Sequence, residues 1–413
     1  ASNLGSLIAL LSYPVLIEPF AGLASQAAIW TAGFIALGLG LAACGLAMAA
    51  VQKLGRAGAA ADTESTEDAG VAAPAWRDRL VWIWLAAVPS GLLVAFSSYL
   101  TTDIASAPFL WVLPLAAFLA TFILVFTERP WISQRLLLLV QPLLAAGVMM
   151  GLGITSNGGW LRSLVAGSGA FFVTTMVAHR ELYERRPAAA RLTEFYLFMS
   201  LGGVLGGMFA ALAAPKLFST IWEFPLLVVA GMACRPGVLT ARVDADERRR
   251  LIMIGLGGIV ALNIAWFGLS SGLVTRLVPV HVTLLGGMAL LALASRQKPL
   301  RQLVLTTLMV ATIAMLPSGL NTGTSERSFF GVHWISHRAG QHMRLLMHGT
   351  TVHGAERLID PVTGNRPLEP VPATYYYPAG PMAQGVGIAR TVAAQSGHFN
   401  VGIVGLGAGS MAC

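Results

Sequence analysis

Three glycines near the end of the chain, Gly405, Gly407 and Gly409, have the residue type and spacing that most directly suggest chemistry. They follow Val401–Val404, a short stretch of mixed apolar character. A strand that runs into a glycine turn begins a Rossmann-type sheet, because the glycines let backbone N–H groups come close to a nucleotide ligand. Residues 401–413 are therefore predicted to form the first strand and glycine loop of an α/β Rossmann-like domain. We expect the rest of that domain in a longer protein, of which this chain is a piece.

Histidines are the second group of residues that could do chemistry. Six of the eight histidines follow residue 318, namely His333, His337, His342, His348, His353 and His398. The spacing of His333 and His337 would suit a zinc site on one helix face. However, Phe329–Ile335 has the pattern of a strand after a turn, and a strand would place the two about 13 Å apart, too far for one metal. We therefore predict no metal site.

The region that would carry these histidines, residues 319–400, is predicted to be a small β-rich module. Arg344–Gly349 has the pattern of a strand, and Thr350–Gly354 is expected to continue it. Pro361–Pro372 is an irregular proline-rich loop, and Gly387–Gln395 is predicted to be a short helix. Short strands followed by a helix and a glycine-terminated strand suit a β-module that leads into an α/β domain.

Composition places most of the chain in a membrane. Apolar residues make up 55% of the 413 residues, charged residues only 11%, and the mean hydropathy is +0.69. A typical soluble protein has about 25% charged residues. The net charge of +8 is explained by the basic loops of a membrane protein, so no nucleic-acid partner is predicted.

Residues 1–318 are predicted to form an α-helical polytopic membrane bundle with about ten spans. Lipid offers no hydrogen-bond partners, so a spanning segment must form its backbone hydrogen bonds internally, as a helix does. Leu7–Ile17 would be the end of a further span. The weakest span is 217–234, which Glu223 and Pro225 interrupt. The ten predicted spans are 24–51, 80–100, 107–126, 136–154, 163–178, 195–213, 217–234, 251–269, 277–294 and 302–318.

Lysine and arginine are distributed unevenly between the loops. Of the 21 before residue 319, alternate loops (52–79, 127–135, 179–193, 235–250 and 295–301) hold 18, and the intervening loops hold three. The positive-inside rule places the first set in the cytoplasm. Residues after 318 are therefore predicted to lie on the extracytoplasmic side.

Two features within the predicted bundle have alternative interpretations. Gly202–Gly207 contains two overlapping GxxxG patterns, which are typical of close helix packing and could also form a hinge or ligand contact. Asp103, in the segment Thr101–Ser106, could cap a turn or contact a substrate or ion at the membrane face. Glu223 lies at the end of an apolar run, where a carboxylate costs little and needs no functional explanation.

Several segments occur in an order that resembles a known family. They are Ser325–Gly331, His348–Gly354, Tyr375–Tyr377 and Val404–Gly409, together with Ser98–Pro114 in the membrane part. This pattern is similar to the bacterial spermidine-synthase-like proteins that are fused to a transporter-like (MFS-type) membrane region. The resemblance implies a bacterial inner (plasma) membrane protein with an aminopropyltransferase-like domain.

The resemblance also implies a cosubstrate and a substrate. Decarboxylated S-adenosylmethionine would bind at Gly405, Gly407 and Gly409, and a polyamine would be the amine that is alkylated. The matching positions imply substrate contacts at His348, His353, Tyr376 and Tyr377. Acids are scarce among these motifs, and no catalytic residue is assigned, so this chain alone is predicted to be inactive.

Two other functions remain open from the sequence. One is a non-catalytic membrane subunit or scaffold that packs against other membrane protein subunits, as the GxxxG pattern suggests. The other is a small-molecule transporter, suggested by the many spans. The apolar runs carry no lysine or arginine near their centres, and this argues against transport because coupled transporters place ionisable groups near the bilayer midplane.

Overall fold

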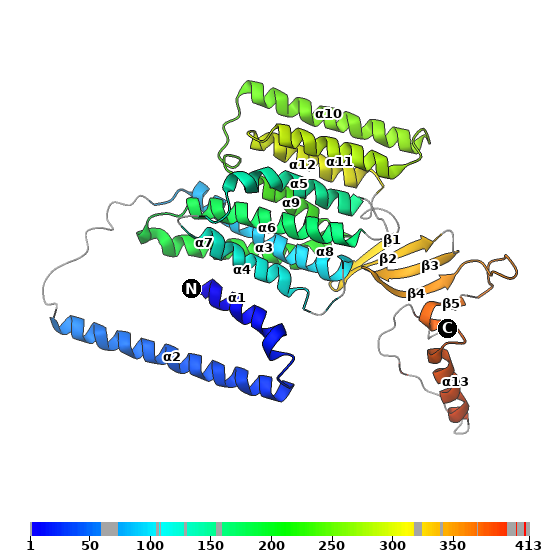
Figure 1. The fold of residues 1–413 in the computed structure, drawn as a ribbon, viewed down its shortest axis with the longest axis horizontal. Coiled ribbons are helices and arrows are strands. Elements are labelled where there is room, and N and C mark those ends of the chain that lie inside the picture. The colour runs from blue at the N-terminus through cyan, green and yellow to red at the C-terminus, as the bar shows by residue number, and fades with distance from the viewer. Residues whose placement is uncertain are drawn as a thin grey trace.

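The structure is a computed structural model of the 413-residue chain. It describes residues 2–58, 73–104, 107, 109–127, 130–153, 159–317, 324–338, 342–369, 371–394, 402 and 409. Helices make up most of this part of the chain, and a small antiparallel sheet lies near the C-terminus (Figure 1).

Seven of the described helices are long and apolar enough to cross a membrane, which is the architecture of a membrane-embedded protein. Two of them are composite: α3 (Trp76–Tyr99) continues into a π-helical turn (Leu100–Ile104), and α7 (Leu192–Met208) continues through a second π-helical turn (Phe209–Ala213) into α8 (Ala214–Leu217). The other five are α2 (Leu23–Gly58), α5 (Gln134–Gly153), α6 (Trp160–Glu184), α10 (Ala245–Ser270) and α11 (Leu277–Ala294).

Three of the ten predicted spans coincide with shorter apolar helices. They are α4 (Val112–Val125, 14 residues), α9 (Glu223–Ala233, 11 residues) and α12 (Pro299–Met315, 17 residues). The predicted span 217–234 is cut because α8 ends at Leu217 and the chain turns before Glu223 starts α9. An apolar N-terminal helix, α1 (Ser2–Ser12), also ends in a π-helical turn, Tyr13–Ile17.

The closest helix packing is between α3 and α7, and it depends on glycine. A Cβ atom at Gly202 would overlap the backbone of Ile83, and one at Gly206 would overlap the carbonyl of Ala87. Gly203 lies outside this contact, although its carbonyl accepts a hydrogen bond from Ser90 Oγ at 2.7 Å. The prediction that Gly202–Gly207 packs helices closely is confirmed for the first of the two GxxxG patterns.

Aromatic stacking joins three helices at the centre of the bundle. The ring of Phe96 on α3 stacks on Phe171 of α6 at 5.5 Å and on Phe224 of α9 at 5.7 Å. Tyr99 stacks on Phe224 from the next turn of α3, at 5.0 Å. Phe96, Phe171 and Phe224 are fully buried, so this stack holds the short helix α9 in place.

The described parts of the five loops rich in lysine and arginine lie at one end of the bundle, where they contact one another or the helix ends beside them. An ion pair joins Arg79 to Glu194, beside the loop 179–193, and another joins Arg301 to Glu247. Two further contacts, Arg77 to the carbonyl of Leu239 and Arg180 to the carbonyl of Thr127, link the remaining loops.

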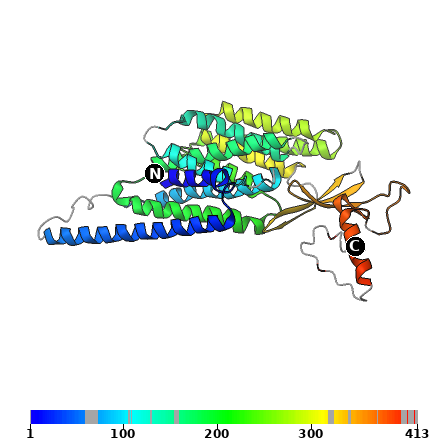
Figure 2. The same ribbon diagram turned by 60° about the horizontal axis from the view of Figure 1, so that its bottom comes forward.

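The sheet extends beyond the other end of the bundle (Figures 1 and 2). Its five strands pair in chain order, each antiparallel to the next, so that alternate turns meet the bundle. The strands are β1 (Thr324–Ser328), β2 (Gly331–Arg338), β3 (Met343–His348), β4 (Thr351–Arg357) and β5 (Val371–Ala373), followed by α13 (Pro381–Ala394).

One expected strand continuation is wrong. Thr350–Gly354 does not extend the preceding strand, because the chain reverses at Gly349, whose φ of +56° is a conformation that favours glycine. The amide of Thr350 donates to the carbonyl of Thr102, 3.2 Å away at the end of the first composite helix. A Cβ at Gly349 would overlap that carbonyl, so the β3–β4 turn attaches the sheet to the bundle.

Candidate functional site

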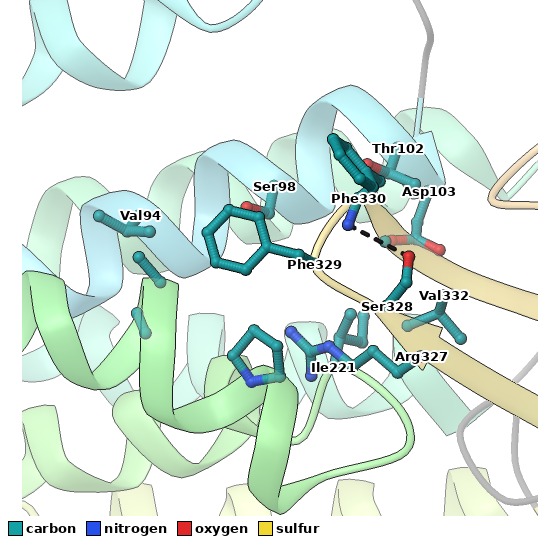
Figure 3. A pocket seen from close by; sticks show the side chains of 14 residues that line it. Val94, Ser98, Thr102, Asp103, Ile221, Arg327, Ser328, Phe329, Phe330 and Val332 are labelled. Atoms are coloured by element: carbon teal, nitrogen blue, oxygen red, sulfur yellow. Dashed lines mark hydrogen bonds between the residues drawn. The ribbon is translucent and has the colours of Figure 1, made fainter.

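A cavity of about 230 Å³ lies where the bundle meets the sheet (Figure 3). Its walls come from the end of α3, the end of α7, and the β1–β2 hairpin. The lining residues are Val94, Ser98, Thr102, Asp103, Ala210, Ala211, Pro215, Ile221, Arg327, Ser328, Phe329, Phe330, Gly331 and Val332.

Both membrane helices that line the cavity change to π-helical geometry there. The turn Leu100–Ile104 carries Thr102 and Asp103, and the turn Phe209–Ala213 carries two of the lining alanines. Pro215 gives a reason for the second turn, because proline has no N–H to donate to the carbonyl four residues earlier. Such widened turns occur frequently at functional sites.

A buried ion pair joins the hairpin to the bundle beside the cavity. The guanidinium of Arg327 donates two hydrogen bonds to the carboxylate of Glu223, at 2.7 and 2.8 Å, and a third to the carbonyl of Thr220. The side chains of Arg327 and Glu223 are only 8% and 2% exposed. Glu223 begins α9, where the helix dipole also stabilises a carboxylate. Glu223 is thus not at a solvated run end, as the sequence suggested, but buried, and its ion pair with Arg327 offsets the cost of that burial.

A second carboxylate, that of Asp103, lies in the wall of the cavity itself, and Asp103 is half-buried. Within the described ranges, no residue donates a hydrogen bond to it or forms an ion pair with it. Its carboxylate interacts electrostatically with Glu223 and Arg327. Its two predicted interpretations, a turn cap and a contact with a substrate or ion at the membrane face, both stay predictions.

The predicted substrate residues His348 and His353 lie next to each other on the sheet, outside the cavity lining. Their ring centres are 5.7 Å apart, and the ring of His333 stacks on His348 at 4.6 Å. His348 also reaches the hairpin, because its Nε2 lies 3.2 Å from the carbonyl of Phe330, which can only accept. His353 occupies a bulge in β4, and its Nε2 is buried without a partner among the described atoms.

The pairing of strands, and not the spacing along one strand, brings these histidines together. His333 lies opposite His348, whereas His337 lies opposite Arg344 and away from the cluster. Burial, together with the nearby His348 and His353, lowers the pKa of His333. Within the described residues, no group of three or more His, Cys, Asp or Glu side chains is arranged to hold a metal ion.

The aromatic segment after β5 lies beside β4. Tyr376 packs on Tyr375, with ring centres 4.3 Å apart, and the exposed Tyr377 follows it. The hydroxyl of Tyr375 donates to the carbonyls of Val352 and His353, so Tyr375 fixes this segment to the sheet. Tyr376 and Tyr377 are therefore close in sequence to the anchor but do not line the cavity.

Two of the predicted cosubstrate glycines, Gly405 and Gly407, lie outside the described residues. Gly409 is described, and its φ of +74° is a conformation that a glycine loop requires. Comparison with known proteins gives no match to this chain among protein-family models, curated proteins or solved structures.

Proposed function

We propose that this chain is a polytopic membrane protein that binds a small organic cation, such as a primary amine, in the cavity between its bundle and its sheet. The observation that carries the proposal is the position of Asp103. Its carboxylate lines the cavity without a hydrogen-bond donor among the described residues, while Arg327 is committed to Glu223. A half-buried carboxylate of this kind favours a ligand that brings its own positive charge.

The charge balance of the site supports a cation over an anion. With both carboxylates ionised, Asp103, Glu223 and Arg327 carry a formal charge of −1, because two carboxylates face one guanidinium. Near a protein surface, opposite unit charges 4 Å apart attract by about 4 kcal/mol at an effective dielectric constant of 20. An ammonium group beside Asp103 would restore neutrality.

Size and chemistry narrow the class of ligand. Drug-sized ligands occupy sites of about 300 to 1,000 Å³, so a cavity of about 230 Å³ fits a small amine or the end of a longer one. The hydroxyls of Ser98 and Thr102 can accept hydrogen bonds from an ammonium group.

An amine ligand agrees with the resemblance to membrane-fused spermidine synthases, whose polyamine substrates are cationic amines. The proposed relationship adds a decarboxylated S-adenosylmethionine site at Gly405, Gly407 and Gly409. We expect the purified full-length protein to bind that cosubstrate and Gly407→Val to abolish the binding. Equal binding by the variant would contradict the proposed site.

A binding measurement on the purified full chain in lipid nanodiscs tests the amine site. Titration calorimetry with putrescine and spermidine should detect binding, and Asp103→Asn should weaken it about 10- to 100-fold, the range expected for a charge-assisted hydrogen bond. Glu369→Gln, which removes one negative charge from an exposed loop, is the matched control. Unchanged affinity in an Asp103→Asn variant with the wild-type melting temperature would refute the proposal.

We further propose about ten membrane spans, with the sheet outside the cytoplasm of a bacterium. The support is the count of 18 basic residues against three, together with the contacts that gather the basic loops at one end of the bundle. A cysteine at the exposed Val362 of the sheet should react with an impermeant maleimide in intact cells. One at Val243, in a basic loop, should react only after lysis, in a background without native cysteines. The reverse pattern would overturn the orientation.

A second candidate function, a non-catalytic subunit of a larger membrane complex, is favoured by α2. Its apolar stretch, Leu23–Val51, has no buried residues, and the helix stands apart from the bundle in Figure 1. Purification in mild detergent with crosslinking from a photoreactive residue at Phe34 would test it. A subunit should give a specific crosslink to another membrane protein, whereas crosslinks to lipid alone would exclude a partner on this helix.

A further inference from the structure

The tip of the β1–β2 hairpin carries two exposed aromatic rings at the junction between sheet and bundle. Phe329 is 67% exposed and Phe330 is 86% exposed, and their rings meet edge to face with centres 6.4 Å apart. Two adjacent exposed phenylalanines at the tip of a tight turn are costly in water. An apolar environment outside the protein would lower this cost.

The hairpin tip reaches back along α3 toward the membrane-spanning part of the helix. Figure 3 shows the ring of Phe329 directed toward Val94 and Ser98, and both residues line the cavity with it. Val94 lies ten residues before Ile104, which corresponds to about 15 Å along a helix. The tip is thus well below the end of the composite helix.

The length of that helix sets the depth of Val94 in a bilayer. The segment Trp76–Ile104 has 29 residues and is about 43 Å long, whereas the hydrocarbon core is about 30 Å thick. Even if all of the excess length lay at the Ile104 end, Val94 would still lie at the edge of the hydrocarbon. The ring of Phe329, directed toward Val94, therefore lies close to the boundary between headgroups and acyl chains.

Both backbone polar groups of Phe330 have hydrogen-bond partners. The amide of Phe330 donates to Ser328 Oγ at 3.2 Å, and the carbonyl of Phe330 accepts from His348 Nε2 at 3.2 Å. Polar backbone groups without partners are costly near hydrocarbon, so these two hydrogen bonds lower the cost of placing Phe330 close to the lipid. The apolar outer surface of α7 continues beside the cavity, with Met208 and Leu212 both exposed toward the surroundings.

We infer that Phe329 and Phe330 insert into the bilayer at the boundary between lipid headgroups and acyl chains, so that the hairpin anchors the sheet to lipid as well as to the bundle. The partner is phospholipid, and the inference does not depend on amine binding or on the orientation of the protein. Aromatic rings are favoured at this depth because they place apolar surface in lipid near the interface.

Site-directed spin labelling of the full chain in phospholipid nanodiscs tests the insertion. Phe330→Cys and, separately, Phe329→Cys would carry the nitroxide, in a background where Cys44, Cys234 and Cys413 are replaced by alanine. Val362→Cys is the control, because it is an exposed apolar residue in the β4–β5 loop, which Figure 1 places at the end of the sheet away from the bundle.

Nitroxides at positions 329 and 330 should collide more often with lipid-soluble oxygen than with an aqueous nickel chelate, and the control should show the opposite preference. Equal access to nickel at all three positions would show that the tip is in water and would overturn the inference. Protection from both reagents would show that protein covers the tip, which also overturns it. A labelled variant is compared with the control only if it keeps the melting temperature of the unlabelled protein. A result at either position, 329 or 330, is sufficient to support or overturn the inference.

Discussion

The ion pairs at the two ends of the helical bundle differ in how deeply they are buried. At the end with the basic loops, ion pairs are partly exposed, as in Arg180–Glu184, where the side chains are 17% and 40% exposed. At the sheet end, the Arg327–Glu223 pair is only 8% and 2% exposed. Exposed pairs contribute about 0 to 1 kcal/mol each, whereas removing one partner of a buried pair costs about 3 to 5 kcal/mol.

This difference in burial predicts how much stability a substitution costs at each end. The basic end is held by several weak contacts between loops, so that the loss of one leaves the others in place. The sheet end depends on a few buried contacts, chiefly Arg327 with Glu223 and the Gly349 turn against Thr102. The proposed amine site lies between those two contacts, so its shape depends on them.

The largest expected effect comes from breaking the buried pair. Glu223→Gln would leave the guanidinium of Arg327 buried opposite a neutral amide, and we expect a loss of about 3 to 5 kcal/mol in unfolding free energy. Glu184→Gln makes the same chemical change at the basic end and should cost less than about 0.5 kcal/mol. Thermal and denaturant unfolding in detergent measure both. Similar losses of unfolding free energy in the two variants would contradict the proposed difference between the buried and the exposed ion pairs.

A smaller effect is expected from the turn that attaches the sheet. In Gly349→Ala, the added methyl would overlap the carbonyl of Thr102 at a positive φ, so we expect a loss of about 1 to 3 kcal/mol. The amide of Thr350 should then exchange faster with solvent, because its hydrogen bond to Thr102 is lost.

Gly364→Ala is the matched control for that change. Gly364 has a similar positive φ of +69°, but no atom lies near an added Cβ. The control therefore carries the backbone strain without the overlap. If the amide of Thr350 exchanged equally slowly in both variants, the turn at Gly349 would not be in close contact with Thr102.

The smallest expected effect is a pH dependence of the sheet. Burial and the neighbouring His348 and His353 lower the pKa of His333 in the folded protein, so the unfolded chain binds a proton more readily. Stability from this residue is present above pH 6.5 and is lost as the pH falls through the lowered pKa. The arginine pairs at the basic end keep their charge in this range.

Hydrogen exchange of β2 to β4 and of α7, which contains no histidine, followed between pH 7 and pH 5, should show destabilisation in the strands and not in α7. His333→Asn should reduce the pH dependence of the strands while leaving α7 unchanged. An NMR titration of the His333 ring with a midpoint at or above 6.5 would contradict the lowered pKa.

The sequence predicted most of the elements because their signals are local. Apolar runs predicted the helices, and the alternation in Phe329–Ile335 predicted a strand that the structure has as β2. The predicted helix Gly387–Gln395 overlaps the longer α13, which ends at Ala394 and begins at Pro381, a residue well suited to a first helical turn. The predicted count of about ten spans differs from the seven described helices of membrane length, because a hydropathy run does not reveal where a chain turns.

The candidate site was harder to predict because its parts are distant in sequence. Glu223 and Arg327 are 104 residues apart, and neither lies in a motif that indicates a partner. The histidine spacing drew attention to His333 and His337, whereas strand pairing joined His333 to His348. The acid that interrupts the apolar run 217–234 was the one available signal for the buried pair.

The sequence by itself determined that this protein is embedded in a membrane, since apolar content and the placement of basic residues are properties of composition and order along the chain. It also determined that Gly202 and Gly206 would pack two helices closely. Only the tertiary structure decided that Asp103 and the Arg327–Glu223 pair lie beside one cavity, and that Phe329 turns back toward α3 (Figure 3). Local patterns set each element, whereas contacts between distant elements depend on how helix ends and turns fit together in space.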